Sequence, residues 1–246
     1  MRRISAIVLT LASLGILGTE SSFAADMAMP LKTPMVAAPV PFSWTGFYIG
    51  GNIGAGWGTN EVTLLANPSI PLAANLPLGT VNPSGFLGGG QIGFNWQTGW
   101  VVWGVEGDFD GADIQGSGAC LAVFPCSSKT NWLATASGRV GGVVLDRILA
   151  YVKGGGAWKN TQYSASDPLG IEFAPGTSTS TTTTRSGWLL GLGVEYAFTP
   201  NWTGFIEYDY MDFGSSTVNF ATPAGVYGAS ITDKLSEVKG GVNYKF

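Results

Sequence analysis

Four carboxylate residues stand in two pairs, and the members of each pair are separated by a single residue. The pairs are Glu106 with Asp108 and Glu207 with Asp209. On a β-strand this spacing places both side chains on one face, and two close carboxylates can share general acid–base work. The chain contains no histidine, which removes the commonest general base, the commonest metal ligand and every Ser–His or Cys–His nucleophile pair. We therefore interpret the pairs as structural charges, and we expect no enzyme active site, no metal site and no cofactor.

The composition differs from that of an ordinary soluble enzyme. Charged residues make up 11% of the 246 residues, against about 25% in typical soluble domains, and the 37 glycines are about twice the usual share. The length fits one domain. The formal net charge of −4 argues against a surface that binds nucleic acid.

The N-terminal region has the features of an export signal. Two arginines precede an apolar stretch, residues 4–17, that is too short to span a bilayer comfortably, and small residues follow at the expected cleavage positions. The alternative is an uncleaved membrane anchor, which the polar residues after the apolar stretch disfavour. We predict a signal peptide at 1–24, a proline-rich periplasmic linker at 25–43 and one folded domain at 44–246.

The two cysteines lie close together in the sequence. Cys120 and Cys126 enclose five residues in a stretch without periodic hydrophobicity. Because an exported protein meets an oxidising compartment, we predict a small loop disulfide between them. A pair of reduced thiols is the alternative.

Apolar residues alternate with small or polar ones along much of the chain. Between Ser186 and Phe198 every second residue from Trp188 onward is large and apolar, the residues between them are mostly small or polar, and Leu189 is an exception. This period of two is typical of β-strands with one apolar face. The pattern recurs in segments that begin at Phe47, Phe86, Val101, Trp132, Ile148, Trp202 and Val238, which predicts eight strands.

The connections between these segments are short at one end and long at the other. The short ones are residues 97–99, 145–147 and 199–201, and the long ones are residues 59–83, 111–129, 160–185 and 215–232. Bacterial outer-membrane barrels combine short periplasmic turns with longer extracellular loops. We therefore predict an all-β fold, an eight-stranded antiparallel up-and-down transmembrane β-barrel.

The apolar face must point outward, because the interior of an eight-stranded barrel is too narrow for so many large side chains. A soluble lipocalin-like barrel is the alternative, but it would expose this face to water. In three strands the aromatic ends are ten residues apart, which spans about 25 Å for a tilted strand and matches the apolar height of such barrels. We predict an aromatic girdle of Phe47, Trp57, Phe86, Trp96, Trp132, Trp158, Trp188, Phe198 and Trp202.

The opposite face carries charges of both signs. We predict an interior charge network of Glu106, Asp108, Arg139, Lys153, Glu195, Glu207, Asp209, Glu237 and Lys239, with Lys245 on the same face. We expect Glu207 to pair with Lys239, and Arg139, Lys153 and Glu195 to form a lower cluster. In a narrow lumen such charges must pair or keep water. A paired network that fills the lumen and a solvated thin pore both remain open.

Two segments carry a family resemblance. The opening Trp44-Thr45-Gly46-Phe47-Tyr48-Ile49-Gly50-Gly51-Asn52 and the terminal Gly241-Val242-Asn243-Tyr244-Lys245-Phe246 resemble the small outer-membrane β-barrel (porin-family) proteins of alphaproteobacteria, which are related in architecture to the OmpA and opacity-protein barrels. The resemblance implies a monomer in the outer membrane of a Gram-negative bacterium, in contact with its lipids and lipopolysaccharide. It also implies that Gly241, Tyr244 and Phe246 form the signal read by the barrel-assembly machinery. An ordinary lipid-facing role for Phe246 is compatible with this.

Two functions from different classes remain open. The first is a structural and surface protein that supports the envelope and displays its loops. The second is a small porin for passive diffusion of ions or small solutes. Adhesion or ligand binding through the extracellular loops ranks lower.

Overall fold

The structure is a computed structural model that describes residues 42–65, 76–119, 125–167, 177–222 and 225–246. Nothing helical in these ranges is long and apolar enough to cross a membrane. The predicted signal peptide and residues 25–41 of the predicted linker lie outside the described residues. The strands are β1 (Gly46–Leu64), β2 (Leu76–Val81), β3 (Ser84–Thr98), β4 (Val101–Ala119), β5 (Pro125–Leu145), β6 (Ile148–Asp167), β7 (Thr177–Ala197), β8 (Trp202–Thr222) and β9 (Gly225–Lys245).

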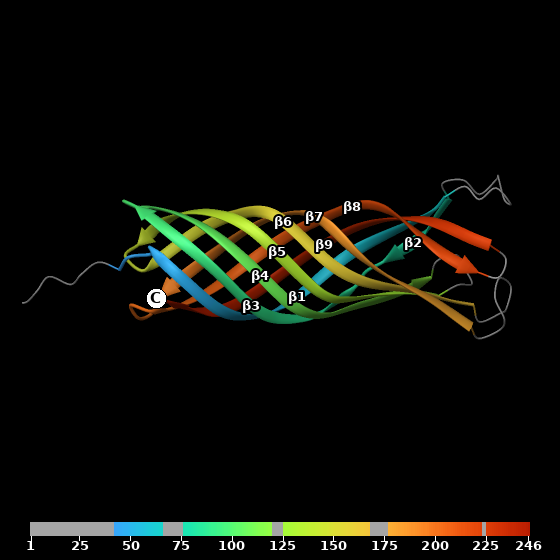
Figure 1. Cartoon of the computed structure of the whole chain (residues 1–246), viewed down its shortest axis with the longest axis horizontal. Helices are drawn as coiled ribbons and strands as arrows, with labels where there is room; N and C mark the ends of the chain where they lie inside the picture. The colour runs from blue at the N-terminus through green and yellow to red at the C-terminus, as the bar shows by residue number, and fades with distance from the viewer. Residues whose placement is uncertain (1–41, 66–75, 120–124, 168–176, 223–224) are drawn as a thin grey trace, which may run out of the picture. The chain divides into compact units, whose positions relative to one another are not determined.

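Eight of these strands close into an antiparallel barrel, as the sequence predicts (Figure 1). Strands β1 and β3 to β9 each pair with the next strand along the chain, and β9 pairs back with β1 from Tyr48↔Lys245 to Leu64↔Ala229. A closed ring leaves no unpaired edge, which a lipid environment requires because it offers backbone groups no water.

The ninth strand, β2, extends the barrel wall rather than widening the ring. It pairs with β1 from Asn60↔Val81 to Leu64↔Leu76, directly above the last pair of β1 and β3. Pro83 separates β2 from β3, and its carbonyl oxygen accepts a hydrogen bond from the Gly58 nitrogen at 2.8 Å. Because proline cannot donate to a ladder, strand pairing is interrupted there, and β2 and β3 are separate strands.

The short turns lie where the sequence predicts them. Turns at residues 99–100 and 146–147 and a bend at 198–201 join strands at one end of the barrel. Gly99 has φ +63°, a left-handed conformation that glycine adopts without steric cost. In outer-membrane barrels the end with short turns is periplasmic.

At the other end the strands are longer than predicted. The low-complexity run at residues 177–184, predicted as loop, is the first part of β7 and pairs with β6 as far as Asp167↔Thr177. The predicted strand boundaries were wrong because, beyond the membrane, neither face needs to be apolar and the alternation disappears. There the strands continue through backbone pairing, which the high β-propensity of threonine favours.

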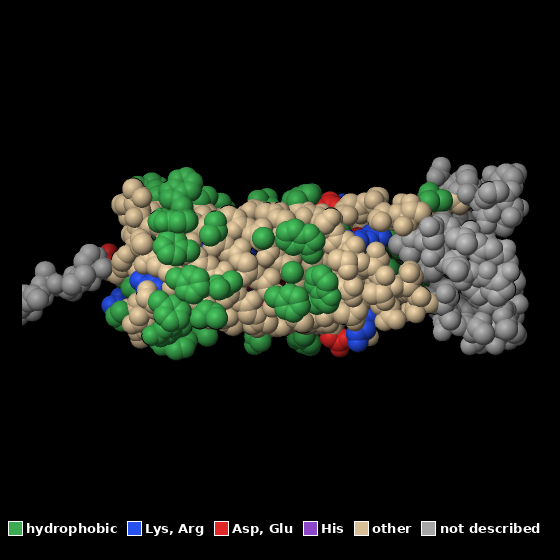
Figure 2. Space-filling model, in the orientation of Figure 1, with side chains coloured by type: hydrophobic (Ala, Val, Ile, Leu, Met, Phe, Trp, Pro, Cys, Tyr) green, Lys and Arg blue, Asp and Glu red, His purple; other side chains and the backbone are tan. Residues whose placement is uncertain are grey.

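The apolar face points outward, and Ile53 and Phe86 are 77% and 78% exposed. Figure 2 shows apolar side chains gathered in two bands across the visible face of the barrel. We call Trp57, Phe86, Trp132, Trp158 and Trp188 the upper girdle and Phe47, Trp96, Phe198 and Trp202, near the short turns, the lower girdle. All are exposed except Trp132, which is partly buried and stacks on Phe109 at 5.9 Å between ring centroids.

Candidate functional site

The nine predicted network charges all point into the barrel. Six strands supply them, β4 to β9, and each residue is between 0% and 8% exposed. They lie on one face because residues two apart on a strand share a face. We call this set, with Asp110, the central network: Glu106, Asp108, Asp110, Arg139, Lys153, Glu195, Glu207, Asp209, Glu237 and Lys239.

Arg139 organises the periplasmic part of the central network. Its Nη1 lies 3.4 Å from Glu106 Oε2 and 3.3 Å from Glu195 Oε2. The rings of Tyr48 and Tyr151 lie on the guanidinium, with centroids 4.7 and 5.1 Å from Cζ. The Tyr48 hydroxyl donates a hydrogen bond to Glu106 at 2.6 Å. Ion pairs and cation–π contacts together hold this buried charge.

Lys153 contacts carboxylates on β4 and β8. Its Cα is opposite that of Arg139, but its Nζ lies 2.7 Å from Glu207 Oε1 and 3.0 Å from Asp209 Oδ2 on β8. The same Nζ lies 3.5 Å from Glu106 Oε1, and Glu106 also pairs with Arg139, so Lys153 adjoins the Arg139 group through Glu106 although its nearest carboxylates are on β8.

The predicted pair of Glu207 and Lys239 is brought together. The two residues are Cα partners on β8 and β9, and the Lys239 Nζ lies 3.2 Å from Glu207 Oε1. The same Nζ lies closer, at 2.8 Å, to Asp108 Oδ1 from the opposite wall. Lys239 therefore links strands across the lumen as well as along the wall.

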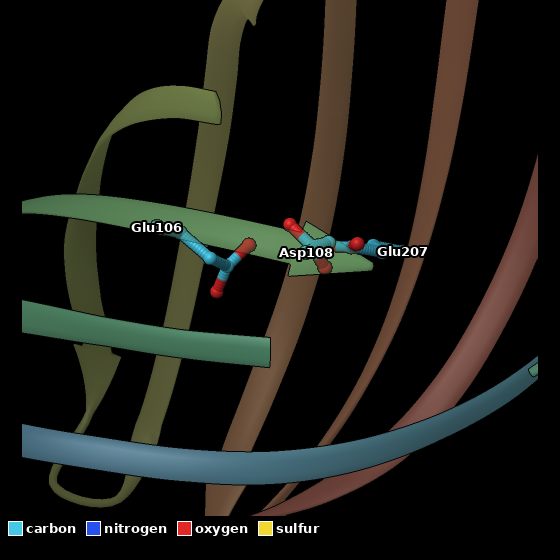
Figure 3. A group of neighbouring side chains, drawn as sticks. All are labelled: Glu106, Asp108 and Glu207. Carbon is cyan, nitrogen blue, oxygen red and sulfur yellow. The ribbon is translucent and has the colours of Figure 1, made fainter. Parts of the chain in front are cut away.

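Three buried carboxylates are grouped in a way that could attract a metal ion. Glu106, Asp108 and Glu207 each place an oxygen within 4.8 Å of the others, and Figure 3 shows their side chains inside the barrel. Carboxylate oxygens suit Mg²⁺ or Ca²⁺. The Lys153 and Lys239 ammonium groups already contact these oxygens. They supply the positive charge that a metal would bring, so the arrangement is one of ion pairs.

Three carboxylates of the central network accept no hydrogen bond on either oxygen in the described part of the chain: Asp110, Asp209 and Glu237. Asp209 still has an ion pair with Lys153 at 3.0 Å, whereas Asp110 and Glu237 lie 3.9 and 3.7 Å from the Lys239 Nζ. The sequence analysis missed Asp110, although the alternation that places Asp108 inside continues to it. Unpartnered buried carboxylates are costly, and this part of the network holds more carboxyl groups than cations.

An apolar layer closes the barrel interior on the loop side of the central network. Its members come from seven strands and are at most 6% exposed: Leu87, Ile114, Leu133, Ala157, Leu189, Met211, Phe213 and Leu235. β1 contributes Gly56, where a Cβ would lie only 2.7 Å from Ile114 Cδ1. Leu133 and Leu189 directly follow Trp132 and Trp188 of the upper girdle. This upper apolar layer is therefore level with the upper girdle.

A second apolar layer closes the periplasmic side. It consists of Trp44, Val102, Leu149, Tyr151 and Ala197. Trp44, just before β1, is 1% exposed, and its backbone nitrogen donates to Gln97 Oε1 at 2.8 Å. Phe42 packs on Trp44 and on Lys245, which lies at this mouth and outside the central network. The central network is thus enclosed between two apolar layers.

A further polar group lies beyond the upper apolar layer, on the loop side. We call Lys159, Tyr163, Arg185 and Asp233 the upper cluster. The Lys159 Nζ lies 2.6 Å from Asp233 Oδ1, and the Tyr163 hydroxyl donates to Asp233 Oδ2 at 3.0 Å. Burial and the Asp233 charge raise the pKa of Tyr163. The sequence analysis missed this cluster because three of its residues, all except Asp233, fell in a predicted loop, residues 160–185, or at its edge.

The terminal residues complete the ring. The Phe246 nitrogen donates to the Phe47 carbonyl at 2.9 Å, and the Tyr244 ring packs edge-on against Trp202 at 5.1 Å. A Cβ at Gly241 would overlap the Gly51 carbonyl oxygen. These contacts give the proposed assembly-signal residues a structural role at the closing seam.

The predicted disulfide lies partly outside the described residues. Cys126, on β5, faces Gly118 of β4 and is not a free thiol. Its predicted partner Cys120 is not described. The disulfide stays a prediction.

Comparison with known proteins identifies the family. A model of the family "Outer membrane protein beta-barrel domain" matches residues 32–246. The chain belongs to this family. The match agrees with the closed barrel, the outward apolar face and the two girdles, and it confirms the resemblance seen in the sequence.

Relatives of this family member are outer-membrane proteins of alphaproteobacteria. The 31 kDa outer-membrane immunogenic protein of Brucella melitensis is 34% identical, over 96% of this chain and 98% of the relative. The 25 kDa outer-membrane immunogenic protein of Brucella abortus is 28% identical over the full length of both chains. The 22 kDa outer membrane protein of Rhizobium leguminosarum is 29% identical, over 83% of this chain and 79% of the relative.

A solved structure supports the fold. The outer membrane protein OprG from Pseudomonas aeruginosa has a TM-score of 0.52 and 13% identity, and the match covers 84% of this chain and 99% of that one. The protein is therefore an outer-membrane β-barrel protein of a Gram-negative bacterium.

Proposed function

We propose that this outer-membrane barrel has a structural and surface role, and that its lumen is closed by its own side chains. The observation that carries the proposal is the enclosure of the central network between two apolar layers. A dry apolar constriction resists both water and ions. A charge moving through the barrel would have to cross two such layers.

The ion pairs support the same proposal. Arg139, Lys153 and Lys239 each contact at least two carboxylates from other strands. Such ion pairs connect strands on different sides of the lumen. Their side chains fill space that water would occupy in a pore. The carboxylates are engaged by cations and the sequence contains no histidine to activate a nucleophile, so we also propose that the protein is not an enzyme.

We further propose contacts with outer-membrane lipids and lipopolysaccharide along the exposed aromatic bands, assembly by the barrel-assembly machinery, and a monomeric state. Surface display of the loop end is supported by the Brucella relatives, whose names describe them as immunogenic. The long upper ends of the strands would provide the displayed surface.

Conductance in planar bilayers tests the closed lumen. The mature protein, refolded and checked by heat-dependent gel mobility, should give no steady channels. A Leu149→Ser, Leu189→Ser, Met211→Ser triple variant should conduct, because it places hydroxyl groups in both apolar layers. Leu190→Ala, on the lipid-facing side of the same strand, is the matched control and should stay silent.

Steady channels from the unsubstituted protein that change with Glu207→Ala or Lys239→Ala would overturn the proposal. That result would favour the porin function, because it would place the conducting path along the central network.

A further inference from the structure

The guanidinium of Arg185 has one edge without a protein partner. Its Nη1 donates to the Ile231 carbonyl at 2.9 Å and lies 4.0 Å from Asp233 Oδ2. Its Nε and Nη2 have no hydrogen-bond partner among the described residues, although the side chain is only 3% exposed. A buried charged donor left unpaired is costly, which points to a bound partner other than the described residues.

The charge balance of the upper cluster points to an anion. Lys159 and Arg185 are Cα partners on β6 and β7, and both side chains are buried. Asp233 is already contacted by the Lys159 ammonium group at 2.6 Å and by the Tyr163 hydroxyl at 3.0 Å. Its single negative charge leaves the upper cluster with one excess positive charge, and like charges on facing residues repel.

The geometry selects the kind of anion. Nε and Nη2 lie on one edge of the planar guanidinium, and this edge matches two oxygens of a carboxylate or phosphate group. The Tyr163 ring, with its centroid 5.4 Å from Arg185 Cζ, limits how the guanidinium plane can turn. The upper apolar layer separates the upper cluster from the central network, so a ligand would approach from the loop end.

We propose that the upper cluster is a binding site for one small oxyanion, a carboxylate or phosphate group, held by the Nε and Nη2 edge of Arg185. The positive charge of Lys159 adds long-range attraction for the anion. The packing of the Tyr163 ring against Arg185 keeps the guanidinium oriented. This site lies outside the enclosed lumen, so it does not depend on whether the barrel conducts.

Calorimetric titration of the refolded mature protein in a neutral detergent tests the site. Sodium phosphate and sodium acetate are the two probes, at constant ionic strength set with sodium chloride. We expect saturable binding of at least one probe, and the stronger one identifies the preferred oxyanion. Arg185→Lys keeps the charge but loses the two-nitrogen edge, so it should weaken binding about tenfold or more. Lys234→Gln, which removes an exposed cation next to Asp233, should leave the affinity unchanged.

The proposal is overturned if neither probe binds saturably to the folded, unsubstituted protein. Equal affinity in Arg185→Lys and the unsubstituted protein would also overturn it, since general electrostatic attraction would then explain the binding. The first outcome needs no variant, so it decides the matter even if Arg185→Lys does not fold.

Discussion

The barrel interior holds more carboxylates than cations, so the loss of a single cation and the loss of a single carboxylate should affect stability differently. Between the two apolar layers the described chain places seven carboxylates and three cations: Glu106, Asp108, Asp110, Glu195, Glu207, Asp209 and Glu237 against Arg139, Lys153 and Lys239. Removing one partner of a buried ion pair leaves an uncompensated charge, which costs far more than the pair contributes. Loss of a cation is therefore more damaging here than loss of a carboxylate.

Lys239 and Glu237 allow a direct comparison. The Lys239 Nζ lies between 2.8 and 3.9 Å from five carboxylates, whereas neither oxygen of Glu237 accepts a hydrogen bond from the described residues. We expect Lys239→Met to lower the free energy of unfolding by about 3–5 kcal/mol. Glu237→Gln should leave it unchanged or raise it, because the amide removes a charge and adds a donor. Urea unfolding followed by tryptophan fluorescence measures both, and equal destabilisation by the two variants would contradict the explanation.

The strands could be predicted well where the membrane imposes a pattern and poorly where it does not. Alternation identified the outward and inward faces, and hence the nine network charges, because lipid demands an apolar outer face. It could not give the height of each inward side chain, since register between strands is absent from the sequence. Leu189 therefore stood out only as an exception to the alternation. Its role became clear from Leu133 and Met211, which reach the same layer from other strands.

Phe246, which directly follows the last strand, β9, has both a structural and a proposed assembly role, and the two can be separated. The backbone nitrogen of Phe246 bonds to Phe47, and its side chain is 68% exposed. Phe246→Leu keeps the backbone bond and an apolar lipid-facing side chain but loses the aromatic ring. If the ring is read during assembly, the variant should reach the outer membrane at a severalfold lower level, while refolding in detergent stays normal.

Val242→Ala, a lipid-facing change on the same strand, controls for lost apolar surface. A normal outer-membrane level of Phe246→Leu would leave Phe246 with its lipid-facing role alone. Impaired refolding in detergent would instead assign the defect to closure of the ring between β1 and β9.

On the scale of the whole molecule, the barrel wall continues well past the apolar bands. Thr182 on β7 is exposed and precedes Trp188 of the upper girdle by six residues, which is about 15 Å along the barrel axis for a tilted strand. The loop end should therefore project from the membrane surface. An outer-membrane barrel with its short turns in the periplasm would present this wall to the outside.

Cysteine labelling in intact cells tests this orientation. Thr182→Cys should react with a membrane-impermeant maleimide, because the hydrophilic wall stands clear of the lipid. Leu192→Cys, which is 58% exposed but lies between the girdles, should react only after the membrane is dissolved and the protein unfolded. The unsubstituted protein reports any labelling of Cys120 and Cys126. If Thr182→Cys reacts only after the cells are opened, the loop end faces the periplasm, and a surface role of the long strand ends is no longer tenable.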